Sequence, residues 1–395
     1  MTIDPDDVRR VLGPIAARPA VAAAIADIGR PGSRWRLPTP ALVVDLDALE
    51  ANIALMVQRA RDAGIGLRPH AKSHKSAYLA RLQIAAGARG VCCAKLGEAE
   101  ALADAGVPGL LVTSPVAGEL AFARAAELAA RVPGFMIVVD HPTAAEGLGA
   151  AAAARGVVLD VVIDVDVGLG RTGAESPQAA ARVAATIAAL PSLRLRGIQG
   201  YGGQWQHMTG AQARRAATEA GMARLTDAIA ALRGEGHAVE IVTGGGTGTF
   251  AADAALGVMT EVQVGSYLFM DRQYRDALDG DADGAFATSL FVQAQVISAN
   301  HPDWVTVDAG LKAMATDGPL PRPTGERFGA SSYRWFGDEH GMITRPPGKV
   351  VQHGERVELE TPHCDPTVDR YDAMYFVRCD NLEHIQPIDG RGRSQ

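Results

Sequence analysis

The chain has 395 residues, 47% of them hydrophobic, and a formal net charge of −7. This size predicts one large domain plus a smaller one, and the acidic balance argues against a general nucleic-acid or anionic-membrane binder. No run reaches the roughly 18 apolar residues that a membrane span needs, and the first thirty residues lack a signal-peptide pattern. The 4 cysteines are too few and too scattered for a disulfide framework, so we expect a cytoplasmic protein with reduced thiols.

Between about residues 40 and 270, β-rich runs alternate with Ala-rich amphipathic stretches such as 48–64 and 180–190. This alternation predicts parallel strands with right-handed crossovers, and eight or more units favour a closed (β/α)₈ TIM-type barrel over an open doubly wound sheet. The runs outnumber the eight places, and the sequence does not identify the extra one. The candidate strands are 41–47, 67–71, 90–94, 110–114, 135–140, 159–167, 195–201, 241–247 and 261–267.

After about residue 285 the pattern changes to β-type runs separated by Gly, Pro and Asp turns. This texture predicts a C-terminal, mainly antiparallel β domain. We therefore predict a barrel over residues 39–283 and a β domain over 284–395. Residues 1–38 are expected to form an N-terminal arm, with packing on the β domain as one option.

In a barrel of this kind, polar groups at the carboxyl ends of the strands point into the site. Read in this way, the strands offer a lysine, an arginine, a tyrosine and a glycine-rich turn. These are the parts needed to hold a phosphorylated aldehyde cofactor. The candidates are His70, Lys72, His74, Asp164, Asp166, Arg171, Gln199, Tyr201, the turn at 243–249, Ser266 and Tyr267.

Lys72 lies in the basic octet "RPHAKSHK", residues 68–75. Neighbouring cations disfavour an ammonium, so Arg68, His70, His74 and Lys75 would free the Lys72 amine for a Schiff base. The alternative is a basic surface turn. His70 and His74 have the i,i+4 spacing of a helical metal site, but a preceding strand and the missing glutamate of H-E-x-x-H argue against zinc there.

The turn "TGGGTGT", residues 243–249, is expected to direct backbone N–H groups at a phosphate, with a plain tight turn equally open. Gly168, Gly170 and Gly173 match the dinucleotide pattern G-x-G-x-x-G. Two aspartates precede that loop, and the following strand offers no acidic residue for a ribose. We therefore assign the loop to presenting Arg171 toward a ring nitrogen.

In "TPHCDPTVDRYD", His363 and Asp365 are two residues apart. On a strand both would point to one face and could share a divalent ion, for which an N,O pair suits Mn²⁺ or Mg²⁺ at least as well as Zn²⁺. The alternative is a surface turn. The charged residues of "GDEHG", 337–341, are expected to form a turn.

Taken together, "RPHAKSHK", "DVDVGLGRTG", "TGGGTGT", "VGSYLFMD", "DAGLKA" and "HCDPT" resemble the fold-type III pyridoxal-phosphate enzymes of the D-threonine aldolase and D-serine dehydratase group. The resemblance runs over nearly the whole chain. It implies an alanine-racemase-like barrel that carries the cofactor, and a homodimer in which the β domain of the same or the partner subunit completes the site.

The resemblance also implies roles for individual residues. Lys72 would bond to pyridoxal phosphate, Arg171 would face the pyridine nitrogen, and Tyr201 would lie near the ring. Three sets complete the implied site: His70 beside the cofactor; Gly245, Gly246, Thr247, Ser266 and Tyr267 at the phosphate; and His363 and Asp365 at a divalent metal, with Mn²⁺ or Mg²⁺ favoured and Zn²⁺ as an alternative.

Two departures bear on function. Related dehydratases tend to carry an H-x-C pair where this chain has H-C-D, which favours an aldolase; conversely, Gly202 replaces the histidine usual in the aldolases. We expect a lyase that cleaves D-β-hydroxy-α-amino acids of the D-threonine, D-phenylserine or D-3-hydroxyaspartate type to glycine and an aldehyde, with His74 or His207 moving the proton. The alternatives are a D-serine or 3-hydroxyaspartate dehydratase, an amino-acid racemase, or a non-catalytic cofactor-binding protein.

Overall fold

The computed structural model describes residues 5–395. The chain forms two compact units that are discontinuous in sequence. Unit 1 contains residues 5–53, 266–276 and 286–391, and unit 2 contains residues 54–265, 277–285 and 392–395. The domain boundaries predicted at residues 38 and 283 stay predictions.

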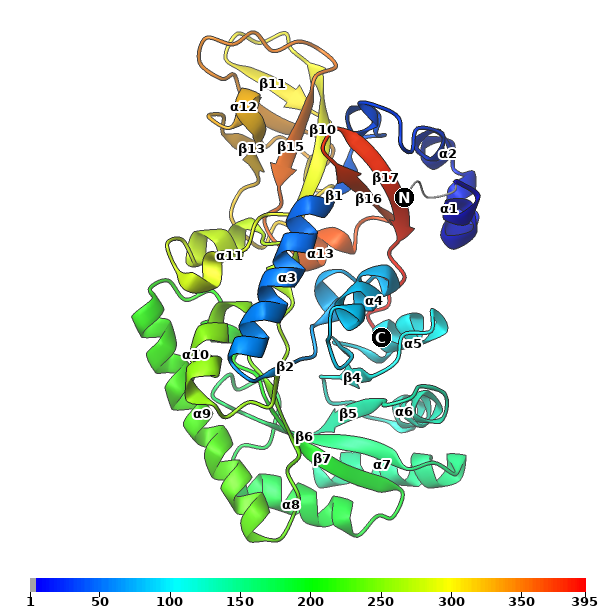
Figure 1. Ribbon diagram of the computed structural model, residues 1–395, viewed down its shortest axis with the longest axis vertical. Helices are drawn as coiled ribbons and strands as arrows, with labels where there is room; N and C mark the ends of the chain where they lie inside the picture. The colour runs from blue at the N-terminus through cyan, green and yellow to red at the C-terminus, as the bar shows by residue number, and fades with distance from the viewer. Residues whose placement is uncertain (1–4) are drawn as a thin grey trace. The chain divides into compact units, whose positions relative to one another are not determined.

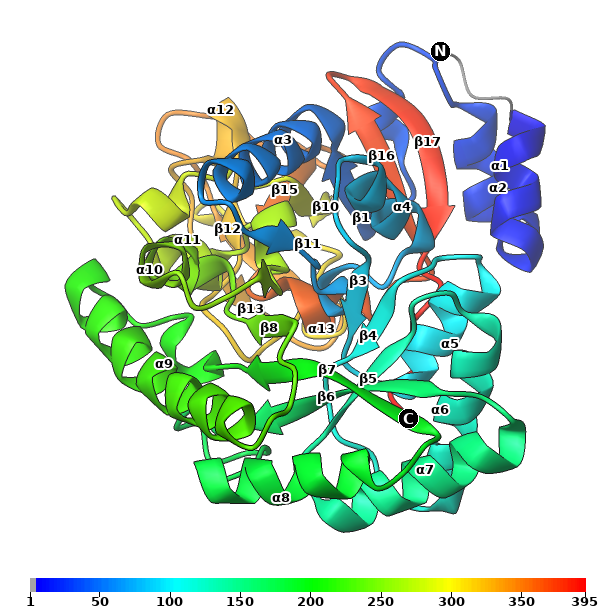
Figure 2. The ribbon, with the colours of Figure 1, turned by 60° about the horizontal axis from the view of Figure 1, so that its bottom comes forward.

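Unit 2 is built on eight parallel strands that curl around a common core (Figure 2). In spatial order they are β2 (Gly66–Leu67), β9 (Glu261–Val262), β8 (Ile241–Gly244), β7 (Leu193–Gly200), β6 (Leu159–Val165), β5 (Met136–Val139), β4 (Leu110–Val112) and β3 (Val91–Cys93). His70, just beyond β2, makes a parallel bridge to Cys92 of β3, so the two edges of the sheet meet there. The predicted TIM-type barrel is confirmed.

Helices connect successive strands and lie on the outer face of the curled sheet (Figure 2). The sequence explains where several of these helices begin and end. Ser76 and Ser176 accept backbone N–H groups as N-caps, and Gly156 ends a helix in the left-handed conformation that glycine favours. The helices are α4 (Ala77–Ala85), α5 (Leu96–Asp104), α6 (Glu119–Arg131), α7 (Pro142–Arg155), α8 (Pro177–Ala188), α9 (Ala211–Gly234) and α10 (Phe250–Leu256).

The extra strand candidate is the first one. β1 (Ala41–Asp45) belongs to unit 1, where it pairs antiparallel with β10 (Leu290–Ser298) and parallel with β16 (Ala373–Arg378). Helix α3 (Leu46–Asp62) then leads the chain into unit 2. Each of the other eight candidates overlaps one of the eight barrel strands.

The sheet of unit 1 has nine strands, and every pairing in it except β1 with β16 is antiparallel. This confirms the predicted antiparallel β domain. The remaining elements are β11 (Trp304–Val307), β12 (Arg322–Pro323), β13 (Tyr333–Trp335), β14 (Gly341–Thr344), β15 (Arg356–Glu360) and β17 (Asn381–Pro387), with the short helices α11 (Arg272–Ala277), α12 (Gly325–Phe328) and α13 (Cys364–Val368).

The N-terminal helices α1 (Pro5–Leu12) and α2 (Pro19–Ala26) pack beside β16 and β17 in unit 1 (Figure 1). Their apolar side chains, including Leu12 and Ile25, share one buried cluster with Val43, Val377 and Ile385. Burial of this shared apolar surface is what holds the two helices on the sheet. None of the helices within residues 5–395 has the length and apolar character that a membrane crossing requires.

Candidate functional site

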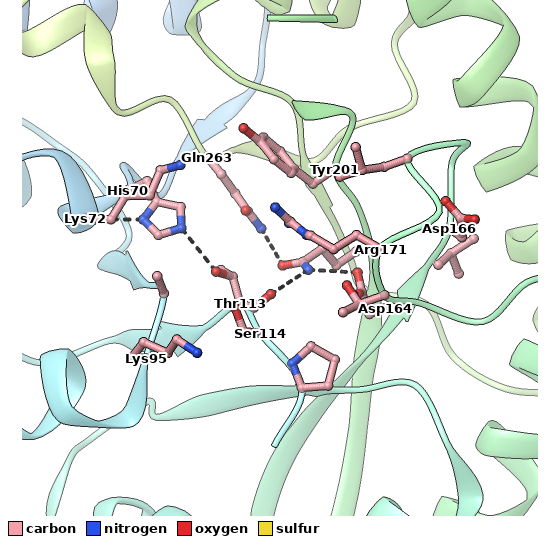
Figure 3. Close-up of a pocket in the computed structure, with 16 residues that line it drawn as sticks. His70, Lys72, Lys95, Thr113, Ser114, Asp164, Asp166, Arg171, Tyr201 and Gln263 are labelled. Carbon is pink, nitrogen blue, oxygen red and sulfur yellow. Dashed lines mark hydrogen bonds between the residues drawn. The ribbon is translucent and has the colours of Figure 1, made fainter. Parts of the chain in front are cut away.

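A cavity of about 340 Å³ lies within unit 2, lined by residues at or just beyond the ends of six barrel strands (Figure 3). Its size falls at the lower end of the range of small-molecule pockets. Seven of the residues predicted from the sequence line it together: His70, Lys72, Asp164, Asp166, Arg171, Gln199 and Tyr201. The position is the one expected for an active site in a barrel of this type.

Lys72 lies in the single turn η3 (Ala71–Ser73), just beyond β2. Its Nζ is 5.9 Å from the centre of the Tyr201 ring, and the Arg171 guanidinium carbon is 5.7 Å from the same centre. Cations at these distances are attracted to the electron-rich ring. Tyr201 therefore helps to hold an amine and a guanidinium at one cavity.

The imidazole of His70 supports the backbone beneath Lys72. Its Nδ1 accepts the Lys72 backbone N–H at 3.3 Å, so Nε2 carries the ring hydrogen of the neutral form. Nε2 lies 3.1 Å from Thr113 Oγ1, which in turn donates to the Cys93 carbonyl at 3.2 Å. These contacts fix the ring and, through it, the start of the Lys72 turn.

A buried network of side chains forms part of the cavity wall (Figure 3). Gln199 Nε2 donates to Asp164 Oδ1 at 2.8 Å and to the Thr113 carbonyl at 3.1 Å, while Gln263 Nε2 donates to Gln199 Oε1 at 2.9 Å. Burial raises the pKa of Asp164 to about 6, although hydrogen bonds from Gln199 and Thr172 oppose the shift. A carboxyl with this pKa exchanges a proton close to neutral pH.

Arg68 and Lys75, two of the cations expected beside Lys72, are each paired with a carboxylate. The Arg68 guanidinium donates to both oxygens of Glu261, at 2.6 and 3.3 Å, inside the barrel. Lys75 Nζ lies 3.2 Å from Glu98 Oε1. Both cations are buried, and a buried charge is costly unless a partner neutralises it.

The glycine loop after β6 binds its own aspartate. Asp166 Oδ1 accepts the backbone N–H groups of Gly168 at 2.8 Å and Gly170 at 3.0 Å. Partial burial alone would raise the pKa of Asp166, but these backbone hydrogen bonds outweigh it and lower the pKa. The loop therefore directs N–H groups at a carboxylate of the chain.

The two histidines predicted to move a proton do not line the cavity. His74 is fully buried, with Nε2 at 3.2 Å from Gln83 Oε1 and Nδ1 accepting the Ser76 backbone N–H at 3.0 Å. His207 is half-buried beyond the turn η4 (Gly203–Trp205). These contacts favour a structural role for His74.

Close packing against Trp205 explains why position 202 is a glycine. A Cβ atom built on Gly202 would collide with the ring of Trp205, which is buried. A histidine at this position would therefore displace Trp205 from its present site. The departure from the aldolase pattern and the buried tryptophan belong together.

The glycine-rich turn after β8 is packed tightly against its own unit. Gly245 has φ of +65°, and a Cβ there would collide with the carboxylate of Asp253. Gly246 N–H donates to Thr249 Oγ1 at 3.2 Å, and Gly248 N–H donates to Gln206 Oε1 at 3.0 Å. Those two N–H groups would have to change partners to hold a phosphate. Gly245, Gly246 and Thr247 do not line the cavity of Figure 3.

Ser266 and Tyr267 begin the turn η6 (Ser266–Leu268) and belong to unit 1. Both are buried, and the Tyr267 ring meets Phe286 edge to face at 5.6 Å. Their assignment to a phosphate stays a prediction.

The predicted metal pair lies at the start of a helix, so the expectation of a strand is wrong. His363 is the N-cap of α13, and Asp365 lies in its first turn. Asp and Pro in the first turn are helix-start signals, which the segment "HCDPT" carries. His363 Nδ1 lies 2.9 Å from Asp317 Oδ2, and Cys364 Sγ lies 3.2 Å from Asp365 Oδ1.

Several cavity residues were not singled out from the sequence: Lys95, Thr113, Ser114 and Gln263. Lys95 follows β3, and Thr113 and Ser114 follow β4. The rule that strand ends face the site would have found Thr113 and Ser114 in the run 110–114, and Lys95 directly after the run 90–94. Gln263, which directly follows β9, could have been found in the same way.

The comparisons with known proteins agree with this architecture. The model of the alanine racemase N-terminal domain matches residues 44–273, and a model of a serine dehydratase domain matches residues 289–377. A 3-hydroxy-D-aspartate aldolase from Paracoccus denitrificans (strain Pd 1222) is 37% identical, over 90% of this chain and 93% of the relative. A D-threonine aldolase from Arthrobacter sp. is 38% identical, over 91% of this chain and 94% of the relative.

Among solved structures, a D-threonine aldolase from Filomicrobium marinum superimposes with a TM-score of 0.88 at 36% identity, over 91% of this chain and 98% of that one. The resemblance found in the sequence motifs is thereby confirmed. The chain belongs to the family described by the alanine racemase N-terminal domain, in a branch whose named relatives include D-threonine and 3-hydroxy-D-aspartate aldolases.

Proposed function

We propose that the chain is a pyridoxal-phosphate-dependent carbon–carbon lyase that cleaves D-β-hydroxy-α-amino acids to glycine and an aldehyde. The observation that carries the proposal is the cavity at the barrel strand ends, where Lys72, Arg171 and Tyr201 meet. The named aldolase relatives, which match about nine-tenths of the chain, support the aldolase reading over a dehydratase or racemase.

The residues at the cavity suit pyridoxal phosphate. Lys72 supplies an amine for its aldehyde carbon, and Arg171 and Tyr201 supply a cation and an aromatic ring at the same cavity. When bound, the cofactor supplies an electron sink for the charge that develops when a bond to Cα breaks. His70 orients Lys72 by accepting its backbone N–H.

The Asp164, Gln199 and Gln263 network would keep the cavity wall rigid around the substrate. Since the pKa of Asp164 is about 6, this carboxyl can hold a proton at the wall under mildly acidic conditions. An alternative proton carrier to His74 and His207 is thus present at the cavity itself.

A divalent metal is the second group that we propose, held by His363 and Asp365. One imidazole and one carboxylate form an N,O donor set that suits Mn²⁺, Mg²⁺ or Zn²⁺. Within residues 5–395, no group of three or more His, Cys, Asp or Glu side chains is arranged to hold a metal ion. A metal on two protein ligands would keep open positions and supply Lewis acidity to a hydroxyl. The homodimer and the cytoplasmic location stay predictions.

The test is an incubation of purified protein, loaded with pyridoxal phosphate and Mn²⁺, with D-threonine, D-3-phenylserine, D-3-hydroxyaspartate and D-serine. We expect glycine and the matching aldehyde in equal amounts from the first three compounds, and the L-isomers serve as controls. Ammonia with a keto acid would instead identify a dehydratase, and inversion at Cα a racemase. No turnover of any compound by cofactor-loaded protein would identify a binding protein.

A further inference from the structure

Asp317, which lies outside the predicted metal pair, holds the imidazole of His363. The distance from Asp317 Oδ2 to His363 Nδ1 is 2.9 Å. An ionised carboxylate only accepts hydrogen bonds, so Nδ1 carries the hydrogen in this contact. In the neutral ring, the lone pair is then on Nε2, which is the nitrogen left to bind a metal.

Buried contacts bring Asp317 to this place. Thr367 Oγ1 of α13 donates to the His363 carbonyl at 2.7 Å and accepts the Ala315 backbone N–H at 3.0 Å. Tyr371 Oη donates to the Ala313 carbonyl at 2.8 Å. These bonds fasten segment 313–317 to α13, and Thr367 and Ala315 are fully buried.

The backbone beyond Asp317 also fits closely. A Cβ atom on Gly318 would lie 3.0 Å from the Pro362 carbonyl oxygen, so the turn after Asp317 lies directly against the residue before His363. On the other side, the fully buried Asp271 accepts the Cys364 backbone N–H at 2.7 Å and fixes the start of α13. Both partners of the His363–Asp317 contact are therefore held by packed backbone.

We propose that Asp317 is a positioning residue for the metal ligand His363, an inference that rests on the metal site of the proposed function. Histidines that bind metals commonly donate their other ring N–H to a carboxylate, which fixes the tautomer and the ring orientation. Since residues 5–395 hold no three-donor group, Asp317 is assigned to the imidazole and not to the metal itself.

If the pair served only the stability of the fold, removing Asp317 would lower the thermal midpoint and leave metal affinity unchanged. The Asp317 side chain is 58% exposed, and ion pairs at such sites contribute little to stability. Removing it should therefore leave the thermal midpoint nearly unchanged. A loss of metal affinity without a loss of stability is the signature of the positioning role.

The experiment titrates EDTA-treated, dialysed protein with Mn²⁺ and follows free Mn²⁺ by its electron paramagnetic resonance signal. We expect Asp317→Ala to raise the Mn²⁺ Kd about 10- to 100-fold. Asp317→Asn should give an intermediate Kd, because the amide oxygen still accepts the Nδ1 hydrogen. His363→Ala should abolish binding at the site.

The matched control is Asp47→Ala, because Asp47 is 57% exposed and pairs with Arg378 in the same unit. It should bind Mn²⁺ like the wild type. Wild-type affinity in Asp317→Ala, with binding lost in His363→Ala, would overturn the inference but leave the metal site standing. Complete loss of binding in Asp317→Ala would make Asp317 a direct ligand and also overturn it. Wild-type affinity in His363→Ala would remove the proposed metal site itself.

Discussion

Within residues 68–75, the charged side chains have separate tasks. Arg68 and Lys75 pair with Glu261 and Glu98 inside the barrel wall, whereas Lys72 reaches the cavity. Pairing offsets the desolvation cost of a buried cation, and it also removes that cation from chemistry. Lys72 is thus the lysine of the octet that lines the cavity, where His70 lies beside it.

We expect Lys72→Ala to abolish the visible absorbance that lysine-bound pyridoxal phosphate gives, because no amine would remain at that point of the wall. Absorbance spectra after cofactor loading and gel filtration measure this. The matched control is Lys95→Ala, which removes the other lysine lining the cavity and should keep the visible band. The opposite pattern would move the cofactor bond to Lys95.

The carboxyl ends of the strands were the sequence feature that identified residues of the candidate site. Lys72, Arg171 and Tyr201 could be predicted because a barrel directs the ends of its strands at one place. Asp317 could not be predicted, because its contact with His363 joins segments that are distant in the chain. Nothing local in the sequence around either residue specifies that pairing.

The conformation of the glycine-rich turn after β8 is fixed by buried hydrogen bonds to neighbouring side chains. Thr249 Oγ1 donates to Asp253 Oδ2 at 2.7 Å, and Gln206 Nε2 reaches the same hydroxyl at 3.1 Å. Burial raises the pKa of Asp253 to about 7, although the hydrogen bond from Thr249 opposes the shift. The folded turn therefore keeps a neutral carboxyl that the unfolded chain would ionise.

This gives a pH prediction for Asp253→Asn. The proton on Asp253 stabilises the fold fully below the unfolded pKa near 4, and that contribution is lost as pH rises through the folded pKa of about 7. The variant has no such proton to lose, so its thermal midpoint should rise relative to the wild type between pH 5 and pH 8. The shift corresponds to roughly 2–4 kcal/mol.

Thermal midpoints of both proteins at pH 5, 6, 7 and 8 measure the effect. Asp62→Asn, at an exposed carboxyl on α3, is the control and should give a difference that is flat with pH. A flat difference for Asp253→Asn as well would mean that the native Asp253 is already ionised at pH 5.

Helices and strands were predicted correctly where the local sequence pattern determines the secondary structure, and incorrectly where it does not. The eight barrel strands and the antiparallel runs after residue 285 follow from apolar periodicity and turn residues. For residues 363–368, the H-x-D spacing was interpreted as a strand, but Asp365 and Pro366 in the first turn favour the helix that forms.

For the whole molecule, the proposed metal ligands and the proposed cofactor residues at the cavity belong to different units. We therefore expect excess EDTA to suppress the cleavage of D-threonine while the visible cofactor band stays unchanged. Adding Mn²⁺ should restore the rate. Full activity in the presence of EDTA would rule out the metal role.

The assignment of strands to units was the part of the architecture that the sequence left open. β1 is almost fully buried, as barrel strands are, so its composition resembles theirs. Its partners β10 and β16 lie far along the chain, and only their presence identifies β1 as a strand of unit 1. Pairing over such separations leaves no local mark.

The position of β1 in the chain also means that β1 is synthesised well before the strands that pair with it. Val44 pairs with Leu290, and Val43 pairs with Tyr375, so the strand leaves the ribosome long before its neighbours. At about 5–20 residues per second, the wait for β10 is on the order of 10–50 s. During that interval β1 is an apolar segment whose backbone N–H and C=O groups have no strand partner, so we expect it to be the part of the nascent chain most exposed to aggregation.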